Sequence, residues 1–95
     1  MGNLNLKYTK EGQIYYYKGS SKHIFKCSKN GSLKYSSKIN ISNESFSKDD
    51  EMYFSIESEL RLATPEEENW LNLAISEGKY VPKPEYTESN NYEIY

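Results

Sequence analysis

Turn residues interrupt the first half of this chain so often that only short segments of regular structure fit between them. Lys10-Glu11-Gly12, Gly19-Ser20-Ser21 and Lys29-Asn30-Gly31 each separate runs of alternating apolar and polar residues. Asn-Gly favours a tight hairpin because both residues tolerate positive φ. Links of about two to five residues join antiparallel strands, since a parallel crossover needs a dozen or more. The chain is therefore predicted to form an antiparallel meander.

Apolar alternation places the strands of this meander. In residues 13–18, Ile14 and Tyr16 would share one face, and Tyr15 and Tyr17 the other. Residues 43–50 read as a polar loop. The other predicted strands are residues 4–9, 22–28, 32–36, 39–42, 52–56 and 60–62.

The best-specified element is a helix over about residues 65–77. Thr64 at the N-cap, Pro65 at the first helical position and Glu67 at the third form a capping box. Gly78 suits the left-handed residue that ends a helix. A wide apolar stripe is expected to face the sheet, made of Trp70, Leu71, Leu73, Ala74 and Ile75. The predicted fold class is α+β, with a small antiparallel β-sheet or SH3-like barrel of about five or six short strands and one C-terminal helix.

The chain is expected to form one domain, because 95 residues rarely divide into two independent cores. Residues 1–81 would make the compact β-rich part with its helix. Residues 82–95 begin Pro-Lys-Pro and continue as an extended, acidic and aromatic tail. Two interpretations of the tail stand: a frayed terminus, or a segment ordered by a partner. The second makes Tyr86, Tyr92 and Tyr95 candidate contact residues.

A cytoplasmic location is expected. Cys27 is the single cysteine, so no disulfide can form within the chain, whereas secreted domains of this size usually depend on such bonds. No segment approaches the roughly 20 apolar residues of a membrane helix. Residues 1–10 lack the apolar run of a signal peptide, and no membrane partner is expected.

Catalytic residues in a usable arrangement are not evident. His23 and Cys27 are the one imidazole and the one thiol, and on a strand they would lie about 13 Å apart. A nucleophile needs its base within hydrogen-bonding distance. One His and one Cys also fall short of a zinc ligand set, and no glycine-rich phosphate loop is present. We therefore expect no enzyme activity, no cofactor and no metal site, with Cys27 as a small buried residue.

With catalysis not expected, the remaining function is binding of another molecule through the protein surface. The distribution of charge along the sequence helps to identify that molecule. Residues 1–42 carry a net charge of +7 and residues 43–95 a net charge of −9. Aromatic rings interleaved with lysines suit single-stranded nucleic acid. Tyrosine also anchors protein interfaces, and the overall pI of about 5.4 is unlike that of a dedicated nucleic-acid binder. The candidate binding surface consists of Tyr15, Tyr17, Lys18, Lys22, Lys26, Lys34 and Tyr35.

One segment carries a resemblance. Arg61-Leu62-Ala63-Thr64-Pro65-Glu66-Glu67 and the helix after it resemble the R-x-A-T-P-E-E segment of many small uncharacterised proteins of bacterial phages and prophages. Lys22-His23-Ile24-Phe25-Lys26 is similar to the Y-I-F-K type strand that precedes it in those proteins. The specific part covers about 20 of the 95 residues, and it implies no activity at any particular residue.

The resemblance implies a context. Small proteins of mobile elements without catalytic residues often bind a host machine, and inhibitors of CRISPR nucleases form one such class. The leading hypothesis is a non-enzymatic, anti-CRISPR type protein that blocks a CRISPR effector nuclease or its guide RNA. In the cytoplasm of a bacterial host, its partner would be a host protein or ribonucleoprotein, with possible RNA contact. The oligomeric state is left open. The alternatives are a small β-barrel that binds RNA or single-stranded nucleic acid, and a virion or assembly component.

Overall fold

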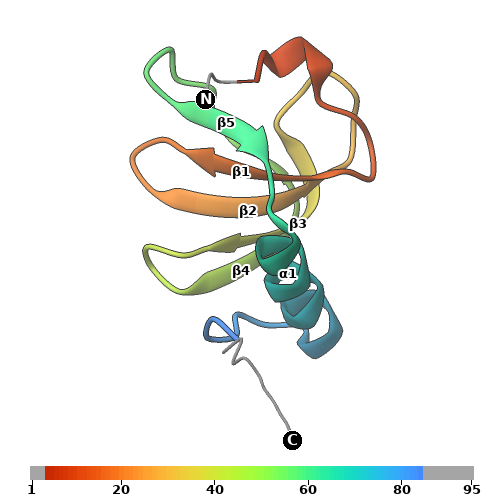
Figure 1. The fold of residues 1–95 in the computed structure, drawn as a ribbon, viewed down its shortest axis with the longest axis vertical. Coiled ribbons are helices and arrows are strands. Elements are labelled where there is room, and N and C mark those ends of the chain that lie inside the picture. The colour runs from red at the N-terminus through yellow and green to blue at the C-terminus, as the bar shows by residue number, and fades with distance from the viewer. Residues whose placement is uncertain (1–3, 85–95) are drawn as a thin grey trace, which may run out of the picture.

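The computed structural model describes residues 4–84, in which one helix lies against an antiparallel sheet (Figure 1). The predicted α+β fold is confirmed. In chain order the elements are the 3-10 helix η1 (Leu6–Tyr8), the strands β1 (Ile14–Lys18), β2 (Lys22–Cys27), β3 (Lys34–Asn40), β4 (Ser45–Glu51) and β5 (Glu59–Leu62), and the helix α1 (Pro65–Glu77).

The five strands form a sheet in the order β4-β3-β2-β1-β5, with every neighbouring pair antiparallel. Because β4 and β5 are its two edges, the described part of the chain forms the sheet of our prediction and not the closed barrel (Figure 1). The first four strands are successive neighbours, whereas β5 returns to pair with β1. The segment between β4 and β5 therefore has to pass from one edge of the sheet to the other.

Four predictions of strands and loops are wrong. Residues 32–36 and 39–42, predicted as two strands, contribute to the single strand β3, because Ser37 and Lys38 between them also pair with β2. Residues 4–9 contain η1 in place of a strand, because the Asn5 side chain caps a turn by accepting a hydrogen bond from the Lys7 backbone N–H at 3.0 Å. Residues 43–50 contain most of β4, which is polar because it is an edge strand with exposed side chains. Residues 52–56 form an irregular loop and not a strand.

Strand β4 has a local irregularity as well. Asp49 adopts the left-handed conformation, with φ of 55°, in the middle of the strand. The pairing with β3 runs from Asn40↔Ser45 to Lys34↔Glu51. This left-handed residue thus lies in an edge strand whose second half is charged.

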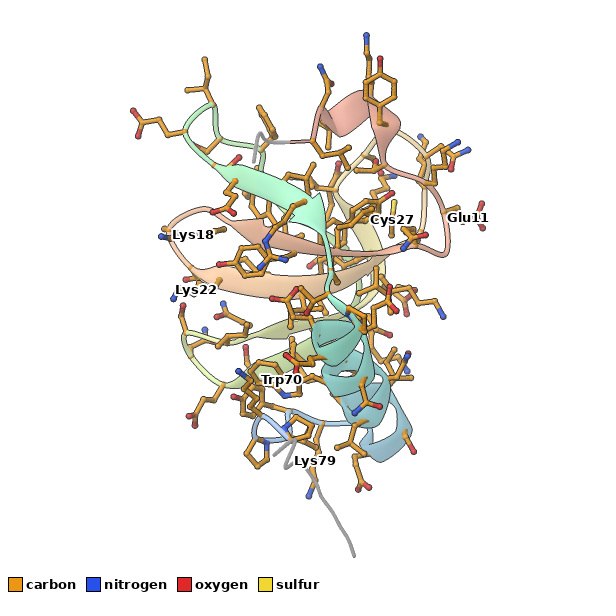
Figure 2. The ribbon with its side chains drawn as sticks, in the orientation of Figure 1. Glu11, Lys18, Lys22, Cys27, Trp70 and Lys79 are labelled. Atoms are coloured by element: carbon orange, nitrogen blue, oxygen red, sulfur yellow. The ribbon has the colours of Figure 1, made fainter. Side chains whose placement is uncertain are left out.

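The helix-face core lies between α1 and the sheet. Figure 2 shows Trp70 beside the helix on this side, and its indole Nε1–H donates a hydrogen bond of 2.8 Å to the Val81 carbonyl oxygen. The predicted burial of Trp70, Leu71 and Ala74 is confirmed, and Ile75 packs partly buried against them. The prediction is wrong for Leu73, which is 40% exposed and lies outside the contact with the sheet. The helix-face core consists of Ile14, Tyr16, Ile24, Ile39, Trp70, Leu71, Ala74 and Val81.

An arginine fixes the start of α1 on the sheet. The guanidinium of Arg61 lies 4.0 Å from the centroid of the Tyr16 ring. Its Nη1 and Nη2 donate hydrogen bonds of 2.8 and 2.9 Å to the Glu67 carboxylate. Burial raises the pKa of Glu67, but the hydrogen bonds from Arg61 and from the Thr64 backbone outweigh it and hold this pKa below 4.5. The capping box therefore also bridges helix and sheet.

A second core covers the opposite face of the sheet. Among residues 4–84, only strands, loops and the N-terminal segment contribute to it, and α1 does not. Leu4 and Leu6 pack against it from the N-terminal segment. Leu33 and Met52 enter it from the loops after β2 and β4. This loop-face core consists of Tyr15, Tyr17, Phe25, Cys27, Leu33, Tyr35, Met52 and Leu60. The sheet is thus buried on both sides, which explains why four consecutive residues of β1 are buried.

Replacing Trp70 with alanine should destabilise the fold by roughly 3–5 kcal/mol, because it removes a large buried ring and leaves a cavity. Urea unfolding followed by circular dichroism measures the loss. Leu73→Ala is the matched control on the same helix; Leu73 is 40% exposed, so its replacement should cost under about 1 kcal/mol. Equal costs for the two variants would contradict the placement of Trp70.

Candidate functional site

Within residues 4–84, the two most exposed large apolar side chains lie in the loop between β4 and β5, residues 52–58, which we call the aromatic loop. Tyr53 is 95%, Phe54 is 54% and Ile56 is 91% exposed. Isolated exposed apolar residues are ordinary, but three within four positions of one loop are not. This clustering makes the aromatic loop the first candidate for a binding site.

The backbone of the aromatic loop is held in place although its side chains are exposed. The buried Tyr17 hydroxyl donates a hydrogen bond of 2.8 Å to the Tyr53 carbonyl oxygen and accepts one of 3.1 Å from the Ser55 N–H. The Ser58 N–H closes a turn onto the Ser55 carbonyl oxygen at 3.0 Å. Met52 is buried in the loop-face core. The loop is therefore positioned by the sheet and does not depend on contacts of its exposed side chains.

Carboxylates flank the aromatic loop on both sides. Between residues 49 and 60 the sequence has no lysine and no arginine. Glu59 lies 3.6 Å from the Arg61 side chain, through Oε2 and Nε. The flanking carboxylates, all exposed, are Asp49, Asp50, Glu51, Glu57 and Glu59. The exposed apolar side chains are thus set in a negatively charged surrounding.

Two hollows border the segment from Asp50 to Phe54, which lines both of them. The η1 pocket, of about 520 Å³, lies between this segment, η1 and the loop before β3. Its remaining lining residues are Leu6, Gly31, Ser32 and Leu33. The sheet pocket, of about 480 Å³, lies on the loop face of the sheet and reaches the β1–β2 turn.

The sheet pocket contains a histidine that is neutral at pH 7. The His23 ring stacks on Tyr17 with 6.1 Å between centroids, and its buried Nδ1 has no hydrogen-bond partner within residues 4–84. Burial first, and the positive charge of Lys38 second, lower the pKa of His23 to about 4. The Lys38 ammonium in turn lies 5.0 Å from the centroid of the Tyr35 ring. This pocket already holds one cation.

The prediction that Tyr15, Tyr17 and Tyr35 form an exposed binding surface is wrong. Their exposed fractions are 2%, 2% and 3%, because the loops and the N-terminal segment cover this face of the sheet. The four candidate lysines alternate with core residues and lie on the opposite, helix-side face. The proposed interleaving of rings and cations on one face therefore does not occur.

The candidate lysines are distributed over that face. Lys18 and Lys22 are cross-strand neighbours at one end of the β1–β2 hairpin, opposite the end that holds Glu11 and Cys27 (Figure 2). Lys26 is half-buried further along β2. Two of the lysines face acids on the edge strands, in the pairs Lys18↔Glu59 and Lys34↔Glu51. The tail candidates Tyr86, Tyr92 and Tyr95 lie outside the described residues.

His23 and Cys27 lie on one strand as predicted, and Cys27 is buried as expected. The Cys27 thiol donates to the Lys29 carbonyl oxygen at 3.1 Å. Within residues 4–84, no group of three or more His, Cys, Asp or Glu is placed to hold a metal ion. No helix in that range is long and apolar enough to cross a membrane.

Sequence reasoning missed the aromatic loop because Met52, Phe54 and Ile56 alternate like one face of a strand. One signal was present. Tyr53 falls between them, so four of the five residues 52–56 are large and apolar, more than one buried face accounts for.

Comparison of the chain with protein-family models, with curated proteins and with solved structures finds no match.

Replacing Tyr17 with phenylalanine should loosen the aromatic loop. The change removes the hydroxyl that both donates to and accepts from the loop backbone, at a cost of about 1–3 kcal/mol. Hydrogen exchange at the Ser55 amide should become faster relative to the core amides. Tyr15→Phe is the matched control, since the Tyr15 hydroxyl accepts a hydrogen bond from the Lys10 N–H and does not touch the loop. Unchanged exchange at Ser55 in the Tyr17 variant would contradict the role of this hydroxyl.

His23 should make stability depend on pH. Between pH 6.5 and about 4 the unfolded chain binds a proton at His23 that the folded chain does not bind. Its contribution is therefore fully present above pH 6.5 and is lost as the pH falls through this window. In urea unfolding, His23→Phe should lose less stability than the native chain between about pH 7 and pH 5. Identical losses would show that His23 is not shielded from protonation.

Proposed function

We propose that this chain is a non-catalytic binding protein that docks on a partner protein through the aromatic loop. The observation that carries the proposal is the exposure of Tyr53, Phe54 and Ile56 on a backbone that Tyr17 already holds in place. Aromatic anchors dominate the energetics of protein interfaces. A loop ordered before binding loses less conformational entropy when the complex forms.

The flanking carboxylates define the charge of that partner. Five exposed acids lie in the loop or next to it in the sequence, and residues 49–60 contain no lysine or arginine. Among nearby cations, Arg61 is paired with Glu59, and Lys38 lies in the sheet pocket. Such a surface repels the phosphates of RNA and DNA. It is complementary to an apolar site bordered by lysine and arginine, and complementary charge steers association with such a site. The loop therefore supports a protein partner over a nucleic acid.

Within this proposal the partner is a bacterial defence complex such as a CRISPR effector. The resemblance of residues 61–67 to phage proteins supports that context. The acidic surrounding of the loop supports a specific mode of action, since an effector must carry a positively charged channel for its guide RNA and target. The aromatic loop would occupy part of that channel and so exclude nucleic acid, without chemistry of its own.

Direct contact with RNA is a second candidate, favoured by one observation. Lys18 and Lys22 are exposed cross-strand neighbours at the end of the β1–β2 hairpin. Contacts of lysine with phosphate weaken steeply with salt. If these residues hold the guide RNA, replacing both with glutamine would lower the affinity for the complex and flatten its salt dependence.

Affinity capture from a bacterial lysate, with and without nuclease treatment, tests the main proposal. The native chain should retain a defence nuclease in both arms, identified by mass spectrometry. The triple variant Tyr53→Ser, Phe54→Ser, Ile56→Ser should lose it, because the apolar anchors are gone.

The matched control replaces Leu62 and Leu73, which are 55% and 40% exposed, with serine. This variant should retain the nuclease. The proposal is wrong if the loop variant captures the same protein as the native chain. Capture that disappears on nuclease treatment would make the RNA candidate the better account.

A further inference from the structure

We infer that the η1 pocket receives an arginine side chain of the partner. The inference rests on the proposed function and specifies the chemistry of its contact. The pocket has a volume of about 520 Å³ and adjoins the exposed side chains of the aromatic loop. A partner that packs on the loop would therefore also cover the pocket.

The walls of the η1 pocket suit the aliphatic part of a long side chain. Leu6, Leu33 and Met52 line it, and the last two are 2% and 8% exposed members of the loop-face core. The walls are tied together, because the Ser32 N–H donates to the Thr9 hydroxyl at 2.9 Å and the Gly31 N–H donates to the Thr9 carbonyl oxygen at 2.9 Å. Such a preformed hollow does not have to be ordered by the ligand.

The charge of the η1 pocket selects a cation. Asp50 and Glu51 line it, and no lysine, arginine or histidine does. Asp50 pairs with Tyr35 across the strands, which places its side chain on the loop face of the sheet, where its Oδ1 accepts a hydrogen bond of 2.8 Å from the Glu51 N–H. Glu51 pairs with Lys34, which places its side chain on the helix side, so Asp50 supplies the carboxylate on the pocket's face of the sheet. Within residues 4–84, neither carboxylate is engaged in an ion pair. The sheet pocket differs, since Lys38 lies in its lining and would repel a second cation.

The aromatic residues favour arginine over lysine. Phe54 and Tyr53 also line the η1 pocket, and a planar guanidinium can stack on a ring while it donates two hydrogen bonds to a carboxylate. The chain shows this combination elsewhere: Arg61 lies 4.0 Å from the Tyr16 ring centroid and binds Glu67 through two nitrogens. The η1 pocket offers the same two partners, a ring and a carboxylate, with the arginine missing.

Titration of the full chain, labelled with ¹⁵N, with the peptide acetyl-Gly-Arg-Gly-amide tests the inference. Amide shifts should be concentrated at Leu33, Met52 and Phe54. The isosteric citrulline peptide, which has no charge, should bind about tenfold or more weakly, because it lacks the charge-assisted hydrogen bonds. The lysine peptide should fall between them.

The double variant Asp50→Asn, Glu51→Gln should also weaken arginine-peptide binding about tenfold or more. Its matched control is Glu68→Gln, Glu77→Gln, which changes the net charge equally on α1 and should leave the affinity within about twofold. The inference is overturned if citrulline binds as well as arginine, if lysine binds as well as arginine, or if both double variants behave alike.

The outcome is independent of the capture experiment. In one outcome the aromatic-loop variant loses the captured nuclease, but the citrulline and arginine peptides bind equally well. This result would support the proposed function and contradict the arginine pocket. The opposite result is selective binding of the arginine peptide together with unchanged capture of the nuclease by the aromatic-loop variant. It would support the arginine pocket and contradict docking through the aromatic loop.

Discussion

Four consecutive side chains of β1 are buried, and they alternate between the two faces of the sheet. Other segments of the chain must therefore pack against both faces. Helix α1 covers Ile14 and Tyr16. The side of Tyr15 and Tyr17 is covered by the N-terminal segment with its short 3-10 helix and by loops. Tyrosine suits this side, because its ring fills the core while its hydroxyl reaches the backbone of the cover. The hydrogen bonds of the Tyr17 hydroxyl hold the aromatic loop in its position.

Charges that the sequence divides between two halves are brought together by the sheet. Five of the eight lysines of the first half lie on β1, β2 and β3, and four acids of the second half lie on the two edge strands beside them. Cross-strand pairs such as Lys18↔Glu59 place opposite charges opposite one another. Asp49, Asp50 and Glu51 at the end of β4, and Glu59 at the start of β5, border the aromatic loop, which itself contains Glu57. Acidic residues therefore stand at both ends of this loop.

The sequence predicts elements whose cause is local. The capping box and Gly78 placed the helix at residues 65–77, and the structure has Pro65–Glu77. The alternating faces of β1 were also predictable, and they are confirmed. The loop-face core could not be predicted in this way. Alternation shows which residues of a strand are apolar, but it does not show which segment of the chain will cover them. Strand β4 was missed for the related reason that an edge strand needs no apolar face.

The left-handed conformation of Asp49 affects how readily the sheet edges of two copies could pair at high protein concentration. An open sheet offers its outermost strand as a template for the backbone of another chain. In β4 the left-handed residue interrupts that template, and Lys48, Asp50 and Glu51 add charge beside the interruption. At the other edge, the Leu4 N–H already occupies the Leu60 carbonyl oxygen at 2.7 Å. Although the aromatic loop exposes three large apolar side chains, both edges of the sheet thus carry features that disfavour edge-to-edge pairing of two copies.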